Sequence, residues 1–204
     1  MKEHGNNEPG AREERKFDPA KAERLEDPER QRFLPHARIA DLLELSGDET
    51  VVDYGAGTGA VAVALAERLT GGRVFAVEEN PQMARLLQEK LASGRDSRVR
   101  PLVIEDNQVP LPDGSADRVL AVNLLHEVVG ETALDEMHRL LSDSGFLLVV
   151  DWSSEVEREQ GPPAHIALSP EQGRAMLEEA GFHVESVPEV GFPYHFALLA
   201  RKGR

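Results

Sequence analysis

The chain has 204 residues, 40% of them apolar, and its 23 Lys and Arg against 37 Asp and Glu give a formal net charge of −14. This length and composition are enough for one sizeable core, and we expect a single domain over residues 17–204. The acidic residues are spread along the chain and repel phosphate backbones, which favours a small-molecule partner over a nucleic acid. The sequence has no cysteine, which excludes disulfides and a thiol nucleophile and favours the cytoplasm.

The N-terminal part of the chain divides into two segments of different composition. Residues 1–16 are charged and poor in apolar side chains, which predicts a flexible tail. They do not resemble a signal peptide, and no apolar run reaches membrane-spanning length, so we expect no membrane insertion. After them, Phe33, Ile39 and Leu43 belong to an apolar pattern that predicts a helical lead-in ending before Gly47.

Short apolar runs then alternate with segments of helical periodicity. The runs that predict strands are 51–54, 74–77, 99–104, 119–122 and 146–150. The apolar residues that predict the intervening helices are Val61, Leu65 and Leu69, then Met83, Leu87 and Leu91, then Leu134, Met137 and Leu141. Asn80 and Pro81 are a typical N-cap and first residue for the second helix. Nearly continuous apolar strands are typical of burial on both faces, so we predict an α/β fold with a doubly wound, mostly parallel sheet and helices on both faces.

The C-terminal part predicts an antiparallel addition to this sheet. A capping-box pattern at Ser169 and Gln172 starts a helix that stops at Gly181. The strand-like runs 182–187 and 194–200 follow, separated by a loop too short for a crossover helix. We therefore expect an antiparallel C-terminal strand pair, which makes seven strands in all.

A glycine-rich turn directly after the first strand gives the sharpest functional signal. Asp53-Tyr54-Gly55-Ala56-Gly57-Thr58-Gly59 leads into an Ala-rich helix, and its glycines allow a ligand to approach bare backbone N–H groups. Glu78 ends the second strand, where a carboxylate can accept hydrogen bonds from two ribose hydroxyls. Together they predict a ligand that contains a nucleoside.

Two cofactors compete for this pattern. Gly55, Gly57 and Ala60 also satisfy the dinucleotide fingerprint, so an NAD(P)-dependent oxidoreductase is an alternative. Asp53 argues against it, because a carboxylate just before the turn would repel a pyrophosphate and attract the ammonium of a methionyl group. The antiparallel final strands also differ from an all-parallel dinucleotide-binding sheet.

Four segments together resemble the class I S-adenosylmethionine-dependent methyltransferases, in the group similar to the ubiquinone-biosynthesis enzymes. They are the glycine-rich turn, Glu78, residues 105–117, and Asn123-Leu124-Leu125-His126-Glu127. The resemblance covers Phe33 to the C-terminus and implies a Rossmann-like fold, S-adenosylmethionine as cofactor and S-adenosylhomocysteine as product. Ala116-Asp117 departs from the family's Phe-Asp pair, which affects packing rather than cofactor chemistry.

The same resemblance implies a set of cofactor-binding residues. Asp106 would accept a hydrogen bond from the adenine amino group, and Asn123 and Leu124 would line the methionyl end. The full set is Asp53, Tyr54, Gly55, Ala56, Gly57, Gly59, Glu78, Glu79, Asp106, Asn107, Asn123 and Leu124.

The candidates for acid–base chemistry are His126, Asp151 and His165, which follow strands at the ligand edge of the sheet. His126 also fits a packing role beneath the cofactor, because methyl transfer often needs little beyond positioning. A cofactor-binding module without turnover is therefore a second alternative. The histidines show no metal-ligand spacing, so we expect no metal. The favoured function is methyl transfer to a small organic acceptor by a monomer or homodimer.

Overall fold

The N-terminal lead-in is helical, as predicted, but it is broken into three short helices. The computed structural model describes residues 18–93, 98–128, 130, 132–186 and 191–203, so the predicted tail lies outside the described residues. The helices are η1 (Pro19–Leu25), α2 (Arg30–Phe33) and α3 (His36–Leu42). Pro28 and Pro35 separate them, because proline cannot donate the backbone hydrogen bond that would continue a helix.

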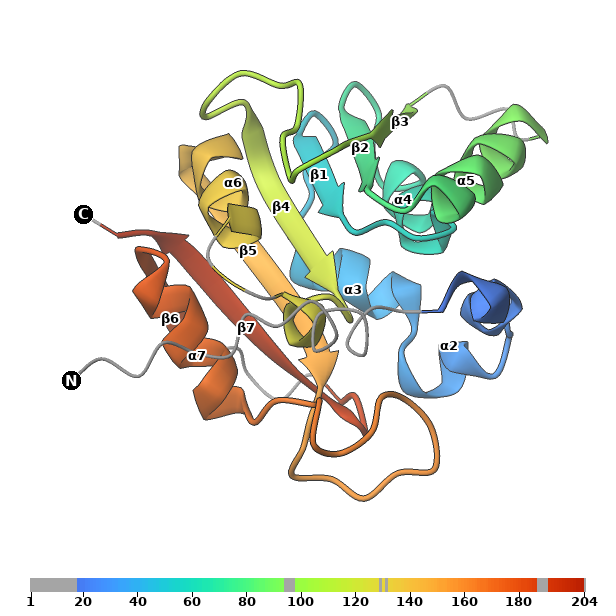
Figure 1. The fold of residues 1–204 in the computed structure, drawn as a ribbon. Coiled ribbons are helices and arrows are strands. Elements are labelled where there is room, and N and C mark those ends of the chain that lie inside the picture. Colours follow the sequence, from blue (N-terminus) through green and yellow to red (C-terminus); the bar gives the residue numbers. More distant parts are fainter. Residues whose placement is uncertain (1–17, 94–97, 129, 131, 187–190, 204) are drawn as a thin grey trace.

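One seven-stranded sheet follows, and it confirms the predicted fold class. Its strands are β1 (Thr50–Tyr54), β2 (Arg73–Glu78), β3 (Val99–Val103), β4 (Ala116–Val122), β5 (Leu141–Trp152), β6 (Phe182–Ser186) and β7 (His195–Lys202). Their order is β3-β2-β1-β4-β5-β7-β6, with β7 antiparallel to both neighbours and the others paired in parallel (Figure 1). The carboxyl ends of β1, β2, β4 and β5 therefore meet at one edge, and β7 begins there.

The remaining helices are α4 (Ala60–Ala66), α5 (Pro81–Ser93), η2 (Leu125–Glu127), α6 (Thr132–Leu140) and α7 (Pro170–Glu179). The predicted N-cap of α5 is confirmed, because Asn80 Oδ1 accepts hydrogen bonds from the N–H groups of Gln82 and Met83. The predicted capping box of α7 is also present, between Ser169 and Gln172.

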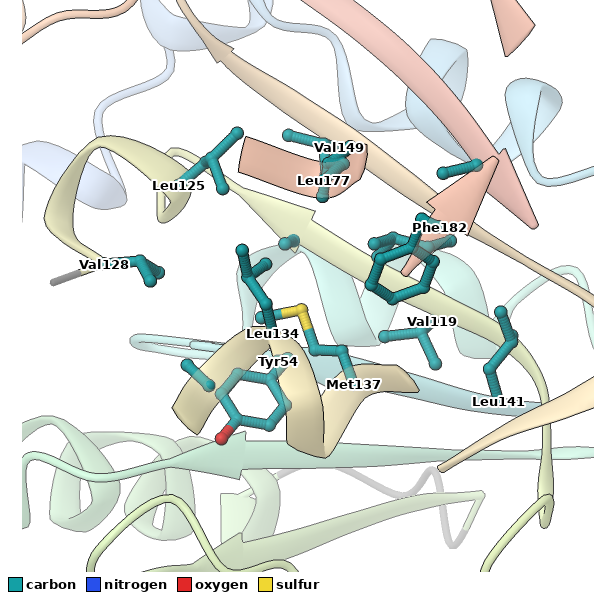
Figure 2. Close-up of a cluster of buried hydrophobic side chains, with 14 of the residues drawn as sticks. Tyr54, Val119, Leu125, Val128, Leu134, Met137, Leu141, Val149, Leu177 and Phe182 are labelled. Atoms are coloured by element: carbon teal, nitrogen blue, oxygen red, sulfur yellow. The ribbon is translucent and has the colours of Figure 1, made fainter. Parts of the chain in front are cut away.

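The core lies on both faces of the sheet because successive strand residues point to opposite sides. Val51 and Leu148 join a cluster with α3, α4 and α5, whereas Val52 and Leu147 join a cluster with α6 and α7. Figure 2 shows the second cluster, in which side chains of α6 gather against the sheet. The prediction of helices on both faces is thus confirmed.

Three sequence-based details were wrong. The third strand was predicted to be buried on both faces, but β3 is at the sheet edge and leaves Val103 49% exposed. Leu69, predicted within a helix, is buried beyond the end of α4, and Leu141 begins β5 rather than ending α6. Each error arises where the three-dimensional position of an element, and not its apolar pattern, decides its surroundings. None of the helices that the structure describes is long and apolar enough to cross a membrane.

Candidate active site

The turn after β1 forms a backbone cradle in a conformation that favours glycine. Gly55, Gly57 and Gly59 have φ angles of 75°, 57° and 75°, in the left-handed region. The N–H groups of Gly55 and Ala56 both donate to Val77 of β2 at 2.9 Å, which ties the turn to the neighbouring strand. A Cβ at Gly55 would lie 2.9 Å from Leu124 Cδ1, so a larger residue there would force the Leu124 side chain to shift.

Glu78, at the end of β2, lies directly under this turn. Its Oε2 accepts a hydrogen bond of 2.7 Å from Gly57 N–H, and its Oε1 accepts one of 2.8 Å from Asn80 N–H. Burial raises the pKa of Glu78 despite these hydrogen bonds. The structure thus brings Glu78 to the turn, where its carboxylate accepts the Gly57 N–H.

Asp53 is buried beside the cradle and lacks a partner for one oxygen. The residue is 2% exposed, and Oδ2 makes no hydrogen bond with any described residue. Burial, together with the nearby charge of Glu78, raises its pKa to about 7. A buried carboxyl group of this kind fits the ammonium of a methionyl group, which would satisfy the free oxygen and restore the ionised form.

The segment after β3 is held in an uncommon backbone conformation. Asp106 and Asn107 have φ angles of 53° and 59°, in the left-handed region that Asp and Asn adopt more readily than other non-glycine residues. The Tyr54 hydroxyl donates to the Asn107 carbonyl at 3.2 Å, and Asn107 Nδ2 donates to Thr132 Oγ1 at 3.1 Å. Burial raises the pKa of Tyr54, which keeps this hydroxyl a donor. The exposed side chain of Asp106 is free to meet a ligand at this edge.

Asn123 repeats this conformation where β4 ends. Its φ is 54°, its N–H donates to Val150 at 2.8 Å, and its buried Oδ1 has no partner in the described part of the chain. Leu124 follows and contributes the side chain that faces Gly55. An orphaned amide oxygen next to the glycine cradle supplies a second polar atom for a bound ligand.

His126 and Asp151 form a buried pair next to this segment. His126 Nδ1 lies 2.6 Å from Asp151 Oδ1, and His126 N–H donates to Asp151 Oδ2 at 3.0 Å. The two residues are 5% and 0% exposed. Burial alone lowers the pKa of His126, but the charge and hydrogen bond of Asp151 outweigh it and raise that pKa above its ordinary value. This pair orients the imidazole and can hold a proton on it.

His165, the third candidate for acid–base chemistry, lies apart from this pair. It is exposed in the connection between β5 and α7, and its side chain has no hydrogen bond or ion pair with the described residues. Among all the residues that the structure describes, no three His, Asp or Glu side chains are arranged to hold a metal ion.

Two groups of residues at the site were missed by the sequence analysis. Glu26, just after η1, accepts a hydrogen bond from the Thr58 hydroxyl and pairs with Lys90 at 2.7 Å, which holds the lead-in against the glycine-rich turn. Phe33 and His195, from opposite ends of the chain, stack on each other with centroids 6.1 Å apart. The sequence signal for this contact was His195 at the start of an apolar strand run. That pattern does not indicate which distant residues pack against the histidine.

Comparisons with known proteins agree with this geometry. A family described as a methyltransferase domain matches residues 52–149. A crystal structure of an S-adenosylmethionine-dependent methyltransferase from Aquifex aeolicus is 32% identical and has a TM-score of 0.84, with 91% of this chain and 98% of that chain covered.

Two curated relatives are matched over part of their length. The demethylmenaquinone methyltransferase of Thermus thermophilus is 32% identical over 116 residues, which are 56% of this chain and 52% of the relative. The malonyl-[acyl-carrier protein] O-methyltransferase of Geobacter sulfurreducens is 30% identical over 177 residues, or 78% of this chain and 66% of the relative. The matches thus span between half and two thirds of these relatives. On its sequence, its fold and a structural match over 91% of its length, the chain belongs to the class I S-adenosylmethionine-dependent methyltransferase family, whose cofactor is S-adenosylmethionine.

Proposed function

We propose that this protein transfers the methyl group of S-adenosylmethionine to a small organic acceptor and releases S-adenosylhomocysteine. The observation that carries the proposal is the buried carboxyl group of Asp53, with one unpartnered oxygen, beside a glycine cradle that Glu78 supports. A pyrophosphate would meet two carboxylates there, whereas an ammonium and two ribose hydroxyls would meet the groups that they need. When bound, S-adenosylmethionine supplies an electrophilic methyl group on a sulfonium.

Different residues at the sheet edge would bind different parts of this cofactor. Asp53 would bind the ammonium, Glu78 the ribose hydroxyls and Asp106 the adenine amino group. The backbone of the glycine-rich turn would lie against the ribose and methionyl parts, with Tyr54 and Asn107 fixing the segment next to the base. Asn123 and Leu124 would close the methionyl end. Glu79 remains a weaker candidate, since Glu78 contacts the turn.

The His126–Asp151 pair is our proposed acid–base element. Because Nδ1 is committed to Asp151, Nε2, which lies 3.8 Å from Glu127 Oε1, is the atom that would exchange a proton with an acceptor. The raised pKa of His126 favours its protonated form, so the residue would act as a base only as the pH rises. His165 would contribute only if its exposed loop folds over the acceptor.

The test is calorimetry with S-adenosylhomocysteine, followed by an assay that detects its formation from S-adenosylmethionine by mass spectrometry. We expect binding that Gly57→Val and Glu78→Ala abolish or greatly weaken, and turnover with a pool of phenols, amines and carboxylic acids. A preference for NADH over S-adenosylhomocysteine would support the oxidoreductase instead. Tight binding without turnover on any acceptor would support a non-catalytic module.

Two further expectations concern the state of the protein. The absence of cysteine agrees with a cytoplasmic setting, and we expect a monomer or a homodimer. Light scattering of the purified chain tests the second expectation directly.

A further inference from the structure

A second polar group lies at the same edge of the sheet, at the start of β7. His195 is the register partner of Trp152, the last residue of β5. Because β5 ends at the ligand edge and β7 runs antiparallel to it, His195 lies at that edge too. It is one strand away from the His126–Asp151 pair, on the side of the sheet's antiparallel addition.

His195 is enclosed by aromatic rings, yet both of its nitrogens lack partners. Its ring centroid lies 4.1 Å from that of Trp152 and 6.1 Å from that of Phe33, nearly parallel to Phe33 at 8°. The residue is 6% exposed, and neither Nδ1 nor Nε2 makes a hydrogen bond with any described residue. Burying two unpaired polar atoms costs free energy, and phenylalanine would supply the same packing without that cost. The imidazole therefore needs an explanation other than packing.

Two arginines lie near this imidazole. Arg30 is three residues before Phe33 on α2, which places it on the same side of the helix, and its buried Nε is unpartnered within the described residues. The guanidinium of Arg158 lies 5.4 Å from the Trp152 ring centroid. Its Nη1 and Nη2 donate to backbone carbonyl groups that follow β5, whereas its buried Nε has no partner among the described residues. Burial, then the charges of Arg30 and Arg158, lowers the pKa of His195 to about 3, so its ring is neutral at physiological pH.

Two of the negative groups nearby, Asp151 and Glu26, already have partners. Asp151 accepts hydrogen bonds from His126 and from the Trp152 N–H at 2.7 Å. Glu26, whose charge also reaches Arg30, is bound by Lys90. Asp27 is a further acidic neighbour of Arg30, but it is exposed, so water screens its charge. Arg30 and Arg158 thus place two guanidinium charges close enough to act on His195, in a protein whose formal net charge is −14.

We propose that Arg30, Arg158 and His195 recognise the methyl acceptor, and that this acceptor carries an anionic oxygen, of a phenolate or a carboxylate, on a planar apolar body. The guanidinium groups attract the charge, the neutral imidazole donates one hydrogen bond to the oxygen, and the rings of Phe33 and Trp152 contact the apolar body. This inference rests on the proposed methyl transfer, because it names the substrate class of that reaction.

The sequence offers a direct reporter for this site, because Trp152 is the single tryptophan of the chain. The full-length protein, saturated with S-adenosylhomocysteine, is titrated with benzoate, with pentafluorophenolate and with benzamide, and Trp152 fluorescence is recorded. We expect a saturable change with at least one of the two anions, and binding of neutral benzamide weaker by about tenfold or more. Benzoate alone would indicate a carboxylic acid as acceptor, and pentafluorophenolate alone would indicate a phenol.

Substitutions connect the fluorescence change to the named residues. Arg30→Gln is expected to weaken binding of the anion by about tenfold, whereas Arg32→Gln, on the same helix and exposed, leaves it unchanged. His195→Phe keeps the aromatic packing and is expected to weaken binding similarly, while raising the melting temperature because two unpaired nitrogens are removed. A lower melting temperature for His195→Phe would mean that the histidine is structural.

The failure of this inference is distinguishable from failure of the proposed function. Benzamide binding as tightly as the anions, neither anion binding, or equal behaviour of Arg30→Gln and Arg32→Gln would overturn the inference. Calorimetry with S-adenosylhomocysteine is run first on every variant and does not depend on the acceptor. If the wild-type chain does not bind that ligand, the methyltransferase proposal fails instead.

Discussion

Glu78 Oε2 accepts a hydrogen bond of 2.7 Å from the backbone N–H of Gly57, so the end of β2 supports the glycine-rich turn from below. The second oxygen of the same carboxylate is held by Asn80 N–H at 2.8 Å. Two fixed backbone donors therefore set the position of this side chain before any ligand binds. Because the Glu78 side chain is already held in place, it loses less conformational entropy when a ribose binds.

Replacing this carboxylate is expected to weaken cofactor binding selectively. Glu78→Gln keeps the size of the side chain but removes its charge and one of the acceptors available to ribose hydroxyls. We expect the dissociation constant of S-adenosylhomocysteine, measured by calorimetry, to rise about 10- to 100-fold. The matched change Glu79→Gln, one residue further on, is expected to have an effect of about threefold or less. Equal losses in the two variants would show that Glu78 has no special role.

Asp53 is expected to make both stability and cofactor binding depend on pH. Its pKa is about 7 in the folded protein and near 3.8 when unfolded, so between these values only the unfolded chain releases the proton. The free energy of unfolding therefore falls as pH rises from about 4 to about 7 and is level above that. Asp53→Asn removes this loss and is expected to stabilise the ligand-free protein by about 2–4 kcal/mol at pH 8, measured by urea unfolding.

Ligand binding should show the opposite dependence at Asp53. An ammonium favours the ionised carboxylate, so affinity for S-adenosylhomocysteine is expected to increase up to about pH 7, by at most about tenfold per pH unit. Calorimetry in two buffers of different ionisation enthalpy would record the released proton below pH 7. An Asp53→Asn protein that shows the same pH profile as the wild type would rule out this role.

The sequence predicted the fold and supplied the candidate cofactor-binding residues because both depend on local patterns. The apolar runs of β1, β4 and β5 are nearly continuous, since these central strands are covered on both faces. The turn from Gly55 to Gly59 is contiguous in sequence, and Glu78 follows at the end of the adjacent strand. Each feature can thus be identified without knowledge of distant contacts.

The proposed acceptor site could not be predicted in the same way. Phe33, Trp152 and His195 come from α2, β5 and β7, and they meet only because β7 inserts between β5 and β6 in the sheet. No local pattern specifies that strand order. The pair of His126 and Asp151 was proposed as two separate candidates, because their contact depends on η2 returning over the end of β5.

Breaking the His126–Asp151 pair is expected to cost much of the stability at low pH. The raised pKa of His126 stabilises the folded protein fully below about pH 6.5, and this contribution is lost as pH rises through the folded-state pKa. Asp151→Asn removes the partner of a buried imidazole and should reduce the free energy of unfolding by about 3–5 kcal/mol at pH 6. Urea unfolding at pH 6 and pH 9 would show a much smaller difference in this variant than in the wild type.

Asp143→Asn provides the control for that experiment, because Asp143 is exposed on the same strand. It should leave the pH dependence of stability unchanged. NMR titration of the His126 ring protons in the wild type and in Asp151→Asn would complete the test. An unchanged midpoint in the variant would contradict the conclusion that Asp151 raises the pKa of His126.

Two glycine substitutions should separate backbone strain from steric contact in the cofactor turn. Gly59 and Gly191 have nearly the same φ, 75° and 72°, so alanine at either position pays the cost of a left-handed backbone, about 1 kcal/mol. A Cβ at Gly59 would lie 2.3 Å from Leu87 Cδ1, whereas a Cβ at Gly191 meets none of the described residues within 4 Å. We therefore expect Gly59→Ala to lower the free energy of unfolding by about 2–4 kcal/mol and Gly191→Ala by about 1 kcal/mol. Chemical denaturation measures both, and equal losses would mean that Leu87 moves aside and leaves strain as the whole cost.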